Sequence, residues 1–289
     1  GVTVRIGVVS PSSKPKSERL LKGLSLLREH ESQLIVGRSC FHYLSPRERA
    51  DELTMMEEIC VVLLCSRGGC GCFLLARYLD RGFRVPICGY SDITFLLLWQ
   101  YAHGEKAFHG PMLCDFHRPS DIEPSFISFL QKEAKLPFRY LGMKNALPIH
   151  PGKANGRLVA ANLSLLMMCL PFFGDKILED SVLLLEDVSE SVDSIERYLW
   201  ALMRYPAFSK VKGIVFSAFT ETRGGSNDYS LRKVLKDALS KPEIPCFIGF
   251  PAYHGKYRKN CLPIGETVEI DSEAGTVTLL SYGGIQWNS

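Results

Sequence analysis

The feature that most constrains the fold is a repeated alternation of short apolar strands and amphipathic helices in the first half of the chain. Residues 61–65 (Val-Val-Leu-Leu-Cys) form a continuous apolar run, which is typical of a strand buried on both faces. The pattern of apolar residues predicts strands at 6–9, 34–36, 61–65 and 85–88, and helices at 17–30, 45–59, 73–78 and 92–102. This order predicts an α/β fold with a doubly wound parallel sheet.

The second half has a different composition of elements and is expected to form its own domain. Helices are predicted at 163–173, 194–204 and 231–239, and strands at 182–185, 214–216, 267–270 and 276–280. Residues 141–155 hold Pro148, Pro151 and two glycines, which is typical of a linker. We therefore expect an N-terminal α/β domain at 1–140, a linker at 141–155 and a β-rich α/β C-terminal domain at 156–289.

Charge and hydropathy exclude several classes of function. The formal net charge of +3 over 289 residues is too small to predict a nucleic-acid partner. No apolar run is long enough to predict a membrane span, and residue 6 already begins an expected strand, with no signal-peptide pattern before it. The ten cysteines include no C-x-x-C pair, so we expect free thiols rather than disulfides or a metal site.

Ser91 is the strongest candidate for a nucleophile. It lies between the strand predicted at 85–88 and the helix predicted from Asp92, so the turn would expose its hydroxyl beside free backbone N–H groups. This arrangement is that of a nucleophile elbow, although the motif G-x-S-x-G is absent. The alternative is an ordinary helix N-cap, for which serine is a favoured residue.

The loop at 66–71 (Ser-Arg-Gly-Gly-Cys-Gly) follows the third predicted strand, and its glycines would let the backbone approach a ligand. A phosphate cradle is one interpretation, but the lysine and the Ser/Thr of a P-loop are missing. A second oxyanion donor is the other interpretation, because parallel sheets bind ligands at the carboxyl ends of their strands.

Two further residues at predicted strand ends could complete a catalytic set with Ser91. Glu186 ends the apolar strand 182–185 and is followed by Asp187, while His254 lies in a loop before Gly255. A serine nucleophile needs an imidazole base, and the base needs a carboxylate to orient it. The alternatives are that Glu186 and Asp187 are solvated acids at a turn and that His254 is an ordinary surface histidine.

With these residues the chain resembles the LD-carboxypeptidases, a family that also includes microcin self-immunity peptidases. The likeness rests on several motifs in one order: Ile6–Ser12, Ser66–Gly71, Gly89–Thr94, Phe108–Met112, Gly156–Leu158, Asn162–Ser164, Leu185–Val188, Gly249–Gly255 and Leu262–Gly265. Each motif is weak alone, and their joint occurrence is specific.

The resemblance implies a serine peptidase without a metal or cofactor, in which Ser91 is the nucleophile, His254 the general base and Glu186 its orienting acid. It implies an oxyanion hole from the backbone N–H of Asp92 and of a glycine in the loop that begins at Arg67. Either Gly68 or Gly69 could supply that donor. The implied reaction releases terminal D-alanine from murein tetrapeptides during cell-wall recycling in the cytoplasm, and many members of the family are homodimers.

The sequence also departs from the family pattern. Cys70 replaces an aromatic residue, Ala161 stands where glycine is common, and Tyr253 stands where a small residue is frequent. The segment 256–259 (Lys-Tyr-Arg-Lys) is unusually basic and could bind a carboxylate. Three alternatives remain: hydrolysis of a peptide-nucleotide antibiotic, a non-catalytic murein-peptide binding protein, and a cysteine hydrolase that uses one of Cys65, Cys70 and Cys88.

Overall fold

The structure is a computed structural model that describes residues 5–30, 33–130, 134–140, 146–188, 190–220, 231–240, 243–251 and 259–283. It divides into two compact units. The first unit comprises residues 1–134, 260–264 and 284–289, and the second comprises residues 135–259 and 265–283. No helix in these described ranges is both long and apolar enough to cross a membrane.

The first unit is built around a six-stranded sheet. Its strands are β1 (Arg5–Val9), β2 (Gln33–Val36), β3 (Val62–Cys65), β4 (Ile87–Gly89), β5 (Ala107–His109) and β12 (Leu262–Pro263). Its helices include α1 (Ser17–Arg28), α2 (Pro46–Glu57), α3 (Thr94–Ala102) and α4 (Pro124–Leu130), with short 3-10 helices η2 (Cys72–Tyr78), η3 (Ser91–Ile93) and η4 (Leu113–Asp115).

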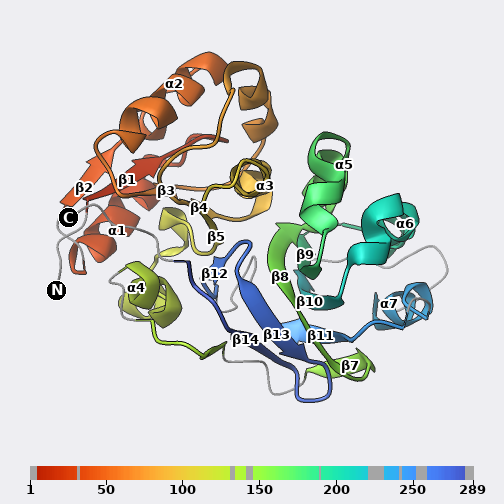
Figure 1. The fold of residues 1–289 in the computed structure, drawn as a ribbon. Helices are drawn as coiled ribbons and strands as arrows, with labels where there is room; N and C mark the ends of the chain where they lie inside the picture. The colour runs from red at the N-terminus through yellow and green to blue at the C-terminus, as the bar shows by residue number, and fades with distance from the viewer. Residues whose placement is uncertain are drawn as a thin grey trace. The chain divides into compact units, whose positions relative to one another are not determined.

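The strand order in this sheet is β12-β5-β4-β3-β1-β2, and every pair from β5 to β2 is parallel. The strands β1 and β3 are almost entirely buried, as expected for a sheet with helices on both faces. In Figure 1, α2 and α3 lie on one side of this sheet and α1 on the other. The predicted doubly wound α/β fold is therefore confirmed.

The sheet reverses its strand order between β1 and β3, because the chain runs outward from β1 to β2 and then crosses back to β3. Ligands of open α/β sheets bind at such a switch point, outside the carboxyl ends of the strands. The loops that follow β1, β3 and β4 thus meet at the edge where this fold places its chemistry.

The second unit is built around an eight-stranded sheet. Its strands are β6 (Phe138–Tyr140), β7 (Leu147–His150), β8 (Lys153–Asn162), β9 (Ser181–Val188), β10 (Gly213–Thr220), β11 (Cys246–Phe250), β13 (Thr267–Asp271) and β14 (Thr276–Leu279). Its helices are α5 (Leu163–Leu178), α6 (Val192–Arg204) and α7 (Leu231–Ala238), with the 3-10 helix η6 (Pro206–Lys210).

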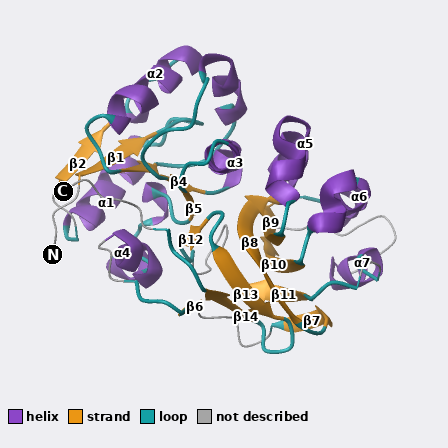
Figure 2. Ribbon diagram, viewed as in Figure 1, coloured by secondary structure: helices purple, strands orange, loops and turns teal. Residues whose placement is uncertain are grey.

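The order in this second sheet is β6-β14-β13-β8-β9-β10-β11-β7. The four central strands β8 to β11 are parallel, and antiparallel strands flank them on both sides. Helix α5 packs against β8 and β9, and α6 packs against α5 and α7 (Figure 2). The predicted β-rich α/β character of the second half is confirmed.

The predicted linker at 141–155 differs from the structure. Residues 147–150 form β7, and residues 153–155 already belong to β8; residues 141–145 lie outside the described ranges. Pro148 lacks the N–H that a central strand needs, but among the described strands β7 pairs with β11 alone and so forms an edge of the sheet. Proline is tolerated at such an edge, and this explains why a proline-rich stretch is a strand here.

The boundaries between the units also differ from the predicted 1–140 and 156–289. Residues 138–140 form β6, which pairs with β14 and thereby joins the second unit. Near the other end of the chain, β12 pairs with β5 and returns residues 260–264 to the first unit. Both differences arise from pairing between segments far apart in sequence.

Candidate active site

The turn after β4 holds Ser91 in an unusual backbone conformation. Its φ of 58° lies in the left-handed region, which a residue with a side chain rarely adopts. Ser91 begins the single turn η3, and α3 follows directly from Thr94. The described residues form no hydrogen bond with the hydroxyl of Ser91, which is partly exposed. The predicted strand-to-helix turn is present.

The glycine loop after β3 passes beside this turn. A Cβ atom on Gly68 would lie 3.2 Å from the Oγ atom of Ser91 and 3.6 Å from the backbone nitrogen of Asp92. Gly69 faces elsewhere: its φ is 116°, and a Cβ atom there would collide with the hydroxyl of Ser13. Of the two candidate glycines, Gly68 is the one whose open side faces Ser91.

The carboxylate of Asp92 is buried. Its Oδ2 atom accepts hydrogen bonds from the hydroxyl of Ser12, at 2.6 Å, and from the backbone N–H of Cys72, at 3.0 Å. Ser12 follows β1, and Cys72 follows the glycine loop. One carboxylate oxygen therefore joins the loops that leave three adjacent strands.

Arg67, the first basic residue of the glycine loop, is exposed. Burial raises the pKa of the nearby Cys114 thiol to about 11, the charge of Asp115 adds to that rise, and the charge of Arg67 opposes it. The cationic side chain of Arg67 therefore lies near Cys114, whose N–H donates to the carbonyl of Ser66 in the same loop.

The sequence interpretation missed Arg49, which lies on α2. Its guanidinium donates to the carbonyl oxygens of Pro11 (3.0 Å), Leu44 (2.8 Å) and Gly71 (3.2 Å). It thus holds the loop after β1 against the glycine loop. A lone arginine on an amphipathic helix carries no sequence signal for such a role, because its partners are backbone carbonyls from distant segments.

Glu186 and Asp187 lie on β9 in the second unit, and both are buried. Burial, opposed by hydrogen bonds and assisted by the charge of Glu186, raises the pKa of Asp187 to about 6. Asp187 accepts hydrogen bonds from the N–H of Ser164 (3.0 Å) and the side chain of Asn162 (3.2 Å). The alternative that both acids are solvated at a turn is therefore wrong.

The structure brings together Ser91, Asp92, Gly68 and Gly69 at one edge of the first sheet, with Arg67 in the same loop. Glu186 belongs to the second unit. His254, Tyr253 and residues 256–258 of the basic segment lie outside the described ranges.

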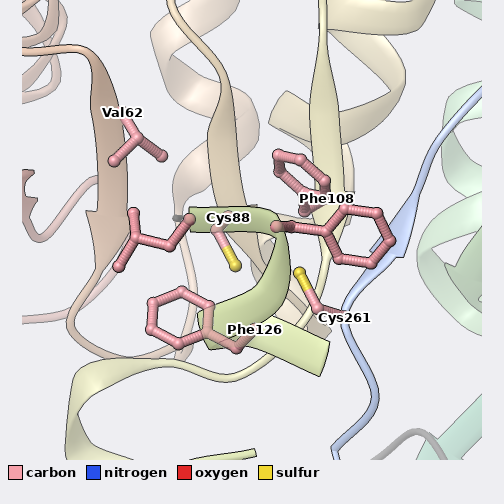
Figure 3. Close-up of a pocket in the computed structure, with 7 residues that line it drawn as sticks. Val62, Cys88, Phe108, Phe126 and Cys261 are labelled. Carbon is pink, nitrogen blue, oxygen red and sulfur yellow. The ribbon is translucent and has the colours of Figure 1, made fainter. Parts of the chain in front are cut away.

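An apolar cavity lies in the first unit (Figure 3). It is lined by Val62, Cys88, Phe108, Phe126, Phe129, Leu130 and Cys261. Gly110 leaves room for the two thiols, since a Cβ atom there would lie 3.0 Å from the sulfur of Cys88 and 3.2 Å from that of Cys261. The lining offers no charged group to a peptide, so this cavity is part of the packing between β3, β4, β5 and α4.

The cysteines proposed as alternative nucleophiles have different surroundings. Cys65 is fully buried, and burial raises the pKa of its thiol well above the ordinary value, which makes it a poor nucleophile. Cys88 is buried against the cavity, and Cys70 is exposed. Within the described ranges, no group of three or more His, Cys, Asp or Glu residues could hold a metal ion.

Comparison with known proteins gives two matches to family models. Residues 6–110 match the LD-carboxypeptidase N-terminal domain, and residues 155–270 match the LD-carboxypeptidase C-terminal domain. The first match covers the five parallel strands of the first sheet, and the second match covers the four central parallel strands of the second sheet.

Individual relatives cover nearly the whole chain. A protein of Bacillus subtilis named "Probable murein peptide carboxypeptidase" is 30% identical over 95% of this chain and 91% of its own length. The murein tetrapeptide carboxypeptidase of Pseudomonas aeruginosa is 27% identical over 92% of this chain and 93% of its own. The structure of MccF in complex with glutamyl sulfamoyl guanosine has a TM-score of 0.87, with 22% identity, and covers 100% and 98% of the two chains. That last likeness establishes the fold.

Proposed function

The chain belongs to the LD-carboxypeptidase family of serine peptidases, and from that premise we propose that it releases a terminal D-alanine from murein tetrapeptides. The observation that carries this proposal is the position of Ser91, at a left-handed turn beside Gly68. The names of the relatives supply the substrate class. We further propose that the reaction serves cell-wall recycling in the cytoplasm.

In this mechanism the hydroxyl of Ser91 attacks the carbonyl carbon of the bond before D-alanine. The attack forms a tetrahedral intermediate whose oxygen carries a negative charge. Backbone N–H groups of Asp92 and Gly68 would stabilise that oxygen, because both residues border the volume around the Ser91 hydroxyl. The hydroxyl itself is a weak nucleophile until a base removes its proton.

The base in this proposal is His254, oriented by Glu186. A carboxylate that is wholly removed from water carries a large desolvation cost, which an imidazolium partner would offset. Its burial at the end of β9 is therefore the reason for choosing Glu186 as the orienting acid. His254 would return its proton to the amino group of the departing D-alanine, and water would then release the peptide from Ser91.

The exposed guanidinium of Arg67 would bind the terminal carboxylate of the substrate, since a carboxypeptidase must recognise a free chain end. No metal or cofactor enters this mechanism. A homodimer is proposed as the working form, on the basis of the family resemblance.

A second candidate function is hydrolysis of an acylated sulfamoyl nucleoside. The Microcin C7 self-immunity protein MccF of Escherichia coli is 25% identical over 93% of this chain, and MccF has been solved with ligands of that kind. Both reactions would use the same serine. They differ in the leaving group, which is an amino acid in the first reaction and a sulfamoyl nucleoside in the second.

The test measures product release from two substrates, a murein tetrapeptide and aspartyl sulfamoyl adenosine. Four proteins are compared: the natural chain, Ser91→Ala, His254→Ala and the control Ser209→Ala, which alters an exposed serine of the second unit. We expect free D-alanine from the natural chain and from the control, and none from the other two.

Two results would change this assignment. Release of sulfamoyl adenosine without D-alanine would favour the second candidate function. No product from either substrate, together with binding of the tetrapeptide in calorimetry, would favour a non-catalytic murein-peptide binding protein.

A further inference from the structure

We propose that Asp92 and Ser12 are positioning residues that aim the backbone N–H of Asp92 at the reacting carbonyl oxygen. Together with the backbone N–H of Cys72 they form the carboxylate clamp, the name used below for these three groups. This inference rests on the proposed function, and it assigns a role to the side chain of Asp92 that is distinct from that of its backbone.

The clamp connects three loops through one atom. Ser12 follows β1, Cys72 follows the glycine loop after β3, and Asp92 follows β4; these strands are neighbours in the sheet. The Oδ2 atom of Asp92 accepts from the hydroxyl of Ser12 at 2.6 Å and from the N–H of Cys72 at 3.0 Å. Two donors on one charged oxygen form stronger bonds than neutral pairs would.

Burial indicates that this carboxylate has a specific task. Asp92 is only 7% exposed and Ser12 only 6%. A buried carboxylate is costly unless its hydrogen bonds are satisfied, and Asp92 does not cap α3, whose N-cap is Ile93. A short charged side chain at this position is favourable where several donors must be held in fixed directions.

The backbone geometry of the turn shows which group the clamp holds, namely the N–H of Asp92. The peptide group between Ser91 and Asp92 is planar and rigid, so the direction of its N–H follows from the conformations of these two residues. Ser91 is in the left-handed region, a strained state that persists only where the surroundings enforce it. The clamp anchors the residue on the far side of that peptide and thereby fixes the direction of its N–H.

The side chain and the N–H of Asp92 have different neighbours. The side chain is anchored to Ser12 and Cys72, whereas the backbone nitrogen lies 3.6 Å from the place of a Cβ atom on Gly68. That place is also 3.2 Å from the hydroxyl oxygen of Ser91. The clamp therefore keeps the negative charge of Asp92 engaged elsewhere while its N–H remains near the nucleophile.

Arg49 supports the same arrangement from the other side. It donates to the carbonyl oxygens of Pro11 and Gly71, the residues that immediately precede Ser12 and Cys72. Both partners of the Asp92 carboxylate are thus held by one guanidinium. Arg49 thus ties the loops after β1 and β3 to each other, and the Asp92 carboxylate ties both to the turn after β4.

This role predicts a defect in the transition state rather than in substrate binding. An oxyanion forms only as the reaction proceeds, so a misdirected N–H lowers kcat and leaves KM nearly unchanged. Loss of one oxyanion donor lowers kcat by about 100-fold to 1000-fold in well-studied serine peptidases, and misdirection should cost less. We expect Asp92→Ala to lower kcat by at least about tenfold, and Ser12→Ala by about threefold.

The experiment measures kcat and KM for D-alanine release by the natural chain, Asp92→Ala, Asp92→Asn and Ser12→Ala. Asp92→Asn keeps one oxygen acceptor for the clamp, so we expect it to retain most of the kcat that Asp92→Ala loses. Affinity for a boronic acid analogue of the product peptide should fall in parallel with kcat, because its tetrahedral adduct uses the oxyanion donors. Affinity for the product peptide itself should be unchanged.

The matched control is Glu57→Ala. Glu57 is also a buried carboxylate of the first unit that accepts from a backbone N–H, that of Arg84 at 2.8 Å, and from the side chain of Arg81. It precedes β3 and so lies at the opposite end of the strand from the clamp. We expect Glu57→Ala to lower the midpoint of thermal unfolding without changing kcat at a temperature where the chain is folded.

The outcomes separate this inference from the proposed function. If the natural chain releases no D-alanine, the proposed function fails. If the natural chain is active and a folded Asp92→Ala or Ser12→Ala variant keeps the natural kcat, the clamp is overturned. Should Asp92→Ala not fold, Ser12→Ala decides the matter, because it removes only one oxygen atom. Equal loss of affinity for product and boronic acid would also overturn the clamp.

Discussion

Ser91 shows at the scale of a single residue how the site opposes local conformational preference. The left-handed conformation of a residue with a side chain costs about 1 kcal/mol, and glycine would adopt it without that cost. Strained residues are frequent at functional sites, where the surrounding structure enforces them. A serine that is retained in this conformation is therefore consistent with a hydroxyl that is needed for chemistry.

Replacing Ser91 should separate stability from activity. We expect Ser91→Gly to raise the free energy of unfolding by about 1 kcal/mol, because it relieves the left-handed strain. Ser91→Ala keeps that strain and should show no such gain, while both variants should be inactive. Urea denaturation of the three proteins measures the difference, and equal stability of the glycine and alanine variants would contradict the role of strain.

Asp187 should make stability depend on pH. Burial raises its folded pKa from 3.8 to about 6, so the folded chain binds this proton more tightly than the unfolded chain does. The resulting stabilisation is complete below about pH 4, and it is lost as the pH rises through about 6. The loss amounts to about 3 kcal/mol for a shift of this size.

The measurement compares the free energy of unfolding of the natural chain and of Asp187→Asn between pH 3 and pH 7. The variant also changes hydrogen bonds, which adds an offset that does not vary with pH. A difference between the two proteins that stays constant over this range would contradict the raised pKa.

At the scale of the element, two of the three glycines in the loop between β3 and η2 have separate structural roles. Gly68 lies beside the turn that holds Ser91, and its φ is not in the left-handed region; Gly69 has a φ of 116° and packs against Ser13. The loop is fastened at Ser13, which donates its N–H to the carbonyl of Gly68 and accepts from the N–H of Cys70.

Alanine at these two positions should therefore have different effects. Gly68→Ala places a methyl group 3.2 Å from the hydroxyl oxygen of Ser91, so we expect at least about a tenfold loss of kcat with little change in stability. Gly69→Ala combines a left-handed φ with a collision at Ser13, so we expect a loss of stability of about 2 kcal/mol. D-alanine release and urea denaturation test both, and equal effects of the two variants on both readouts would contradict this division.

At the scale of the whole molecule, neither unit is a continuous stretch of chain. The first unit recruits β12 to the edge strand β5, and the second unit recruits β13 beside β8 and β14 beside β6. Residues 260–283 therefore complete both sheets. The hydrogen bond from the N–H of Cys261 to the hydroxyl of Ser125 adds a further tie within the first unit, at 2.8 Å.

Ending the chain after Lys259 should weaken both units. Without β12, β13 and β14, strands β5 and β8 each lose a hydrogen-bonded neighbour and expose buried apolar residues. We expect faster amide hydrogen exchange in β5 and in β8 than in the full chain. Faster exchange in β8 with unchanged exchange in β5 would contradict the contribution of β12 to the first sheet.

The sequence by itself determined the first four strands, the helices between them and the turn that holds Ser91. Apolar periodicity is a local property, so the strands before the glycine loop and Ser91, and the helices between them, could be located without a structure. The same holds for Asp92 and the glycines, because a parallel sheet places the loops after its strands at one edge.

Tertiary structure decided everything that depends on pairing between distant segments. The proline-rich stretch at 147–150 became a strand because an edge was available, and residues 262–263 joined the first sheet because β5 was unpaired on one side. The approach of Gly68 to Ser91, the hydrogen bond from Ser12 to Asp92 and the anchoring by Arg49 have no local pattern. Each is a contact between loops, and its energy depends on distances that no periodicity encodes.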